Sequence, residues 1–194
     1  MKASYIFNRK NCHRLYYALG NGVCLWEFFN TAHVSEVSSL RHTLEACWLD
    51  SFVCKDDQHQ QIKDHFQNMS KLISKWHFFN SGEQLQDYLR NNPNVKLITI
   101  MSGRFARTLL ALISEKEALH SVYVFIIDID RNKEAFREDP KLKGIFKTED
   151  ALYNKLRDDL FQLFWNEGAR LSASKHDHEA RVYFDEVKRL LFSD

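Results

Sequence analysis

The sequence predicts an α/β protein: a five-stranded, doubly wound parallel sheet of order 2-1-3-4-5, with a β-rich N-terminal extension and a C-terminal helical hairpin. The segment from Val95 to Asp130 carries most of this prediction, because two nearly unbroken apolar runs flank one amphipathic stretch. Such runs are typical of strands buried on both faces, as in parallel sheets covered by helices. Strand, helix and strand in this order form a βαβ crossover, and the alternation continues on both sides.

Local signals place the individual elements. Ser81-Gly-Glu-Gln84 matches a capping box, and Asn91-Asn92-Pro93 ends the helix that it starts. Thr148, followed by two acids, opens another helix. The expected strands cover 46–50, 76–80, 95–101, 122–129 and 144–147, the expected helices begin near Asp56, Ser81, Arg104 and Thr148, and a short helix is expected over 132–137.

Three parts are expected along the chain: an extension over 1–42, an α/β domain over 43–157 and a helical hairpin over 158–194. In the extension, two β-rich runs flank Gly20-Asn21-Gly22 and favour a β-hairpin, with a helix over 25–29 as the alternative. In the C-terminal part, two apolar stripes at helical spacing are joined by a turn over 172–176.

Composition excludes several classes of function. The net charge of +1 gives no electrostatic basis for a nucleic-acid partner. No apolar run reaches the roughly 18 residues that span a bilayer, and the N-terminus lacks the apolar core of a signal peptide. A cytoplasmic protein that binds no membrane is therefore expected. The four cysteines form no C-x-x-C pair, so we expect reduced, buried thiols and neither a metal nor a cofactor.

Residues from 46 to about 157 resemble a degenerate receiver-like domain of eukaryotic multidomain proteins, which shares its topology with flavodoxin and TIR domains. The resemblance lies in WLD at 48–50, IMSG at 100–103, SVYVF at 121–125 and KGIF at 143–146. It implies acids after the first strand, a phospho-accepting Asp after the third, a hydroxyl after the fourth and a Lys after the fifth. Asp50 and Lys147 stand in the first and last of these places, but Ser102 takes the place of the phospho-accepting Asp and Asp128 that of the hydroxyl.

The resemblance therefore implies the receiver scaffold without its phosphoryl chemistry. Some TIR domains cleave NAD with a glutamate on a comparable helix, but Glu115 and Glu117 lie past the place where that glutamate acts. The C-terminal hairpin is similar to a tetratricopeptide unit in the order and spacing of its small and aromatic residues, with Lys175 where a glycine is usual. The alternative is a plain hairpin that packs on the sheet domain or on a second copy of the chain.

One anion-binding site is expected in the crevice between the ends of strands one and three. Its residues are Asp50, Ser102, Gly103, Arg104 and Lys147, because free N–H groups at a helix start and a nearby arginine attract anions. The alternative is a tight turn with a surface arginine. No catalytic residue is assigned.

The function expected from the sequence is a non-catalytic protein-interaction or regulatory module, with a protein partner bound through the C-terminal hairpin. Self-association of the chain is left open. The alternative is an enzyme that uses a nucleotide or a phosphate, of the TIR-like NAD hydrolase class, acting at the crevice after strands one and three.

Overall fold

The computed structural model describes residues 43–51, 60–126 and 139–192, all within the compact unit Ser38–Asp194. Its five strands form one parallel sheet of order β2-β1-β3-β4-β5, which confirms the predicted fold class and flavodoxin-like topology. The strands are β1 (Thr43–Leu49), β2 (Trp76–Phe79), β3 (Val95–Ser102), β4 (Leu119–Phe125) and β5 (Leu142–Phe146). The expected N-terminal hairpin and the short helix over 132–137 lie outside the described residues.

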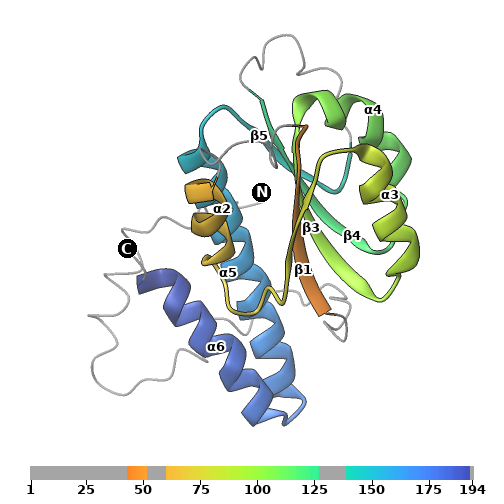
Figure 1. Ribbon diagram of the computed structural model, residues 1–194. Helices are drawn as coiled ribbons and strands as arrows, with labels where there is room; N and C mark the ends of the chain where they lie inside the picture. The colour runs from red at the N-terminus through yellow and green to blue at the C-terminus, as the bar shows by residue number, and fades with distance from the viewer. Residues whose placement is uncertain (1–42, 52–59, 127–138, 193–194) are drawn as a thin grey trace, which may run out of the picture. The chain divides into compact units, whose positions relative to one another are not determined.

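Helices cover both faces of the sheet, as a doubly wound fold requires (Figure 1). Strand β1 shows why: Leu44, Ala46 and Trp48 point into one apolar cluster, whereas Cys47 and Leu49 point into the other. The helices are α2 (Gln60–Gln67), α3 (Gly82–Asn91), α4 (Gly103–Ile113), α5 (Glu149–Ala173) and α6 (Asp177–Phe192). Helices α3 and α4 cover the second face, and α2, α5 and α6 cover the first.

The predicted helix caps are present at α3 and α5. Ser81 Oγ accepts a hydrogen bond from the Gln84 N–H at 3.4 Å, and Thr148 Oγ1 accepts one from the Ala151 N–H at 3.4 Å. In a capping box, the Gln84 side chain would accept from the N–H of Ser81. Here Gln84 Oε1 accepts from the N–H of the preceding residue, Asn80, at 3.0 Å. Both helix starts are therefore fixed by the local sequence.

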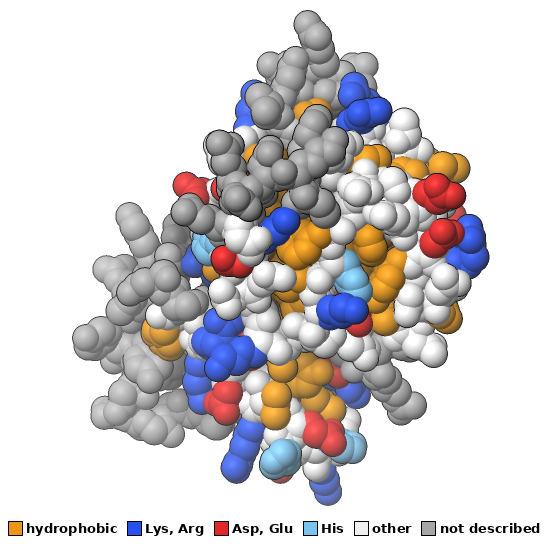
Figure 2. All heavy atoms as spheres, viewed as in Figure 1, with side chains coloured by type: hydrophobic (Ala, Val, Ile, Leu, Met, Phe, Trp, Pro, Cys, Tyr) orange, Lys and Arg blue, Asp and Glu red, His pale blue; other side chains and the backbone are white. Residues whose placement is uncertain are grey.

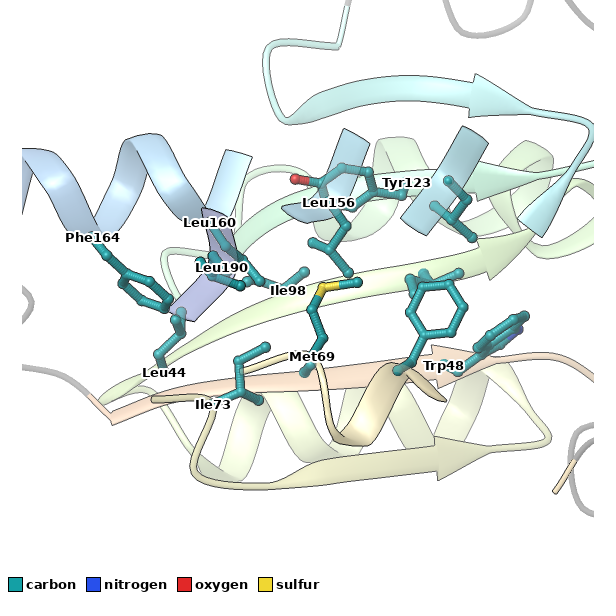
Figure 3. Packing of buried hydrophobic residues seen from close by; sticks show 14 of the residues in the cluster. Leu44, Trp48, Met69, Ile73, Ile98, Tyr123, Leu156, Leu160, Phe164 and Leu190 are labelled. Carbon is teal, nitrogen blue, oxygen red and sulfur yellow. The ribbon is translucent and has the colours of Figure 1, made fainter. Parts of the chain in front are cut away.

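The C-terminal hairpin packs on the sheet. Helix α5 is one helix of 25 residues, so the boundary expected after residue 157 falls inside it. Figure 3 shows Leu160 and Phe164 of α5 beside Leu190 of α6, close to Leu44 and Ile98 of the sheet. The apolar stripes of the hairpin thus contribute to the same cluster that buries the first face of the sheet.

The turn between α5 and α6 contains the one positive-φ residue other than glycine among those described. Lys175 has a φ of 61°, in the left-handed region that glycine adopts most easily. The His176 N–H donates to Leu171 O at 2.9 Å, and the Lys175 N–H donates to Ser172 O at 2.9 Å. These two bonds form a Schellman motif, so Lys175 occupies the glycine position of a helix C-terminus.

A buried ion pair fastens α6 to the segment after α2. Glu186 is 5% exposed, and its Oε1 accepts from Ser70 Oγ and from the Lys71 N–H, both at 2.8 Å. Arg189 donates to both Glu186 oxygens, at 2.7 and 3.0 Å, and also to the carbonyl of Met69. One helix turn of α6 therefore binds the Met69 carbonyl, the Ser70 hydroxyl and the Lys71 N–H.

Candidate functional site

The carboxyl ends of β1 and β3 bring two of the predicted site residues to one edge of the sheet. β1 and β3 are neighbours, with Leu49 paired to Met101. Asp50 directly follows β1, and Ser102 is the last residue of β3. This is the edge at which open parallel sheets bind ligands.

Gly103 has a packing reason to be glycine. A Cβ at this position would lie 2.2 Å from Ile126 Cδ1, which is closer than any real side-chain contact. Helix α4 therefore starts directly against the end of β4, and a larger residue would push the two apart. The tight-turn alternative explains Gly103 without a ligand.

The start of α4 carries positive charge and no side-chain cap. Ser102 makes no capping hydrogen bond, and the first turn holds no acidic residue. Arg104 and Arg107 are both exposed on this helix. The unpaired N–H groups and the positive end of the helix dipole favour an anion at this place, and the arginines add to that field.

Lys147 lies at the same edge but farther along it. It follows β5, and β4 separates β5 from β3. Because neighbouring strands are about 4.8 Å apart, roughly 10 Å separates the lines of β3 and β5. Asp128, which stands in the hydroxyl place of the receiver pattern, lies outside the described residues. Asp50 and the segment 102–104 thus lie at the ends of neighbouring strands, and Lys147 lies two strands away from β3.

A polar cluster that the sequence analysis did not single out joins β1, β2 and α3. Glu45 Oε2 lies 2.5 Å from His77 Nε2 and also accepts a hydrogen bond from Tyr88 Oη. The His77 ring stacks on Phe79 with centroids 5.7 Å apart. Burial raises the pKa of Glu45, but the bonds from Tyr88 and His77 outweigh it, so the pKa lies below its ordinary value. The carboxylate is therefore charged at neutral pH and holds α3 on the sheet.

Cys47 is a buried free thiol, as the sequence predicted for the cysteines, and the other three cysteines lie outside the described residues. Its Sγ donates to Thr99 Oγ1 at 3.4 Å, and burial raises the pKa of Cys47 to about 12. Thiol chemistry needs the thiolate, so this side chain is part of the core. Among the described residues, no three His, Cys, Asp or Glu side chains are grouped as metal ligands would be.

In the described part of the chain, large hydrophobic side chains are exposed at Leu112, Val182 and Phe192. Leu112 of α4 is 63% exposed and borders a groove of about 190 Å³ between α3 and α4. The groove is lined by Gln86, Leu89, Arg90, Leu112, Ile113 and Lys116. On the face shown in Figure 2, hydrophobic side chains gather near the middle, between α2 and α3, where all four residues of the edge strand β2 are only partly buried.

The fold defines the class of this protein: an α/β protein with a five-stranded, flavodoxin-like parallel sheet followed by a C-terminal helix pair. No protein-family model, no curated protein and no solved structure matches the chain. None of the helices in the described ranges is long and apolar enough to cross a membrane.

Proposed function

We propose that the chain is a non-catalytic protein-interaction or regulatory module built on a receiver-like scaffold. The observation that carries the proposal is the exposed Leu112 beside the groove between α3 and α4. Leu89 and Ile113 form an apolar floor there, since they are 4% and 1% exposed. A partner that covers the remaining surface of Leu112 would gain roughly 1–2 kcal/mol from that side chain.

The end of β3 supports the non-catalytic part of the proposal. In the resemblance to receiver domains, Ser102, the last residue of β3, takes the place of the phospho-accepting carboxylate. A serine hydroxyl supplies neither the charge that helps to hold Mg²⁺ nor the carboxylate that forms an acyl phosphate. Asp50 remains at the end of the neighbouring strand, so one acidic residue is present while the phospho-accepting aspartate is absent from this position.

The C-terminal hairpin is the second surface that we propose for a protein partner. Its inner stripe packs on the sheet, so a partner would contact its outer side. Val182 of α6 is 46% exposed and does not belong to the apolar cluster on the sheet. Tetratricopeptide-like use of the inner, concave side would first require the hairpin to leave the sheet.

The test compares baits that differ by one exposed side chain. Wild type, Leu112→Ser, Val182→Ser and the control Ala111→Ser, which alters a neighbouring exposed residue of α4, are used to capture proteins from native extract. We expect one protein to be depleted with Leu112→Ser or Val182→Ser and retained with Ala111→Ser. The purified partner should then bind the depleted variant roughly tenfold more weakly than the wild type.

Two outcomes contradict the proposal. In the first, every captured protein is retained equally by all four baits. In the second, the purified chain acquires acid-labile phosphate from acetyl phosphate in Mg²⁺, or consumes NAD, and loses this activity with Asp50→Ala. The second outcome would favour the enzymatic alternative at the crevice.

A further inference from the structure

Basic side chains converge at the edge of the sheet opposite to Asp50 and Ser102. Lys96, His120 and Lys143 are each the second residue of their strands, β3, β4 and β5, which are neighbours in the sheet. Lys141 directly precedes β5. These four residues, which we call the amino-edge cluster, come from three adjacent strand starts.

Two lysines of the cluster hold consecutive carbonyls of the turn between α4 and β4. Lys141 Nζ donates to Lys116 O at 2.6 Å, and Lys96 Nζ donates to Glu117 O at 3.0 Å. The Lys96 side chain is only 13% exposed, and its ion pair with the Glu117 carboxylate spans 4.0 Å. That carboxylate is 91% exposed, so water screens it. The partners of the Lys96 ammonium are thus a neutral carbonyl and a screened carboxylate, so its charge is offset only weakly.

The His120 ring lies in the resulting positive field. Burial and the charges of Lys143, Lys96 and Lys141 lower the pKa of His120 to about 4. Asp159 of α5 acts in the opposite direction, but its carboxylate already accepts from Tyr123 Oη at 2.8 Å and from Lys155 Nζ at 2.5 Å. The ring is therefore neutral at neutral pH, with its Nδ1 3.2 Å from Ser121 Oγ.

Three further acids, Asp139, Glu115 and Glu117, lie near the cluster and act against the positive field at Lys141. Asp139 accepts from Ser114 Oγ and from the Lys141 N–H, both of them neutral donors, so its carboxylate keeps its charge. The charges of Asp139, Glu115 and Glu117 raise the pKa of Lys141, yet burial and the charge of Lys96 outweigh them, and that pKa lies below its usual value. Both glutamates are exposed.

We propose that the amino-edge cluster binds a small oxyanion, namely phosphate or the phosphomonoester group of a small molecule. Lys96, Lys141 and Lys143 each present an ammonium, which bonds phosphate oxygens as a compact charge. A doubly charged anion offsets the repulsion among the three lysines, and His120 becomes a further donor when the anion draws a proton onto its ring. The site lies at the opposite edge from the crevice and does not depend on the proposed function.

The experiment follows the His120 ring by NMR while inorganic phosphate is added at constant ionic strength, with sodium chloride as the control salt. We expect a saturable shift of the His120 signals with phosphate but not with chloride, and a higher pKa of His120 in phosphate. By linkage, phosphate binding should strengthen as pH falls toward that raised pKa, as long as the phosphate keeps its charge. A parallel titration with AMP separates the two sources: tighter binding than phosphate identifies a phosphomonoester ligand, and equal or weaker binding identifies free phosphate.

Variants localise the site. Lys143→Gln changes an exposed residue and should leave the fold intact while weakening phosphate binding roughly tenfold. Lys141→Gln should have a similar effect, and Lys188→Gln, which removes the same charge from the exposed face of α6, should have none. Shifts that follow chloride equally, or phosphate binding that is unchanged in Lys143→Gln and Lys141→Gln, would overturn the proposal.

Discussion

Replacing Glu186 with glutamine should destabilise the fold more than any surface change on the same helix. The carboxylate accepts from Ser70, from the Lys71 N–H and twice from Arg189, and both charged side chains are largely buried, at 6% and 26% exposure. An amide keeps the shape, but one of its ends cannot accept, and the Arg189 charge loses its counterion. We expect a loss of about 2–4 kcal/mol in the free energy of unfolding.

Urea unfolding followed by circular dichroism measures this loss. Asp185→Asn is the matched control, because Asp185 precedes Glu186 and pairs with Lys188 on the surface, where both side chains are about 70% exposed; its effect should stay below ~0.5 kcal/mol. A loss in Glu186→Gln no larger than in Asp185→Asn would show that the ion pair between Glu186 and Arg189 does not stabilise the fold. A double-mutant cycle with Arg189→Gln should give a coupling energy of about 1–3 kcal/mol.

The ion pair between Glu186 and Arg189 also predicts the sign with which the free energy of unfolding changes with pH. Burial raises the pKa of Glu186, but the bonds from Arg189, Ser70 and the Lys71 N–H outweigh it, so its pKa in the folded protein lies below the usual 4.5. Its contribution is therefore complete above the unfolded pKa and is lost as pH falls through the folded pKa. Wild type should lose stability below about pH 4.5. Glu186→Gln should lose less over that range, and Glu45, whose pKa is also lowered, contributes to the remaining slope.

Three further changes test single features by the same unfolding measurement. Lys175→Gly should raise stability by about 1 kcal/mol, because glycine adopts the positive φ without strain, whereas Lys175→Ala should not. Tyr88→Phe should cost about 1–2 kcal/mol by removing the hydroxyl donor to Glu45, and an unchanged midpoint would show that this bond contributes nothing. Gly103→Ala should cost about 1–3 kcal/mol because its Cβ meets Ile126; adding Ile126→Ala should recover part of the loss, and no recovery would argue against that contact.

The sheet could be predicted because its central strands have no wet face. The apolar runs of β3 and β4 indicated a parallel sheet, and the alternation of five strands with helices indicated the flavodoxin-like strand order. The first residues of the strands were predicted less accurately. Strand β1 begins at Thr43, β4 at Leu119 and β5 at Leu142, each earlier than expected. The start of a strand is defined by its pairing with neighbouring strands. Polar residues there, such as His120 and Ser121, interrupt the apolar run from which the strand was predicted.

Only the part of the candidate site that follows from the strand order could be predicted from the sequence. Asp50 and Ser102 were placed at one edge because neighbouring parallel strands end together. The packing of Ile126 against Gly103 depends on how closely α4 approaches β4, which no spacing in the sequence reveals. The amino-edge cluster depends on register, and both β3–β4 and β4–β5 pairing shift by an irregularity near the strand starts. His120 and Lys143 also lay outside the expected strands, which began at 122 and 144, so the sequence did not place them beside Lys96.

The fastening of α6 to the segment after α2 has a consequence for the order of folding. The hydrogen bond from Ser70 to Glu186 joins residues 116 positions apart, and Val187 and Leu190 cover the same face as Leu44. Contacts of such long separation form late, because the loop they close is costly in entropy. During synthesis, the first strand is made long before the helix that completes its cover. A nascent chain without α6 therefore presents an apolar sheet face to its surroundings, where a chaperone could bind it.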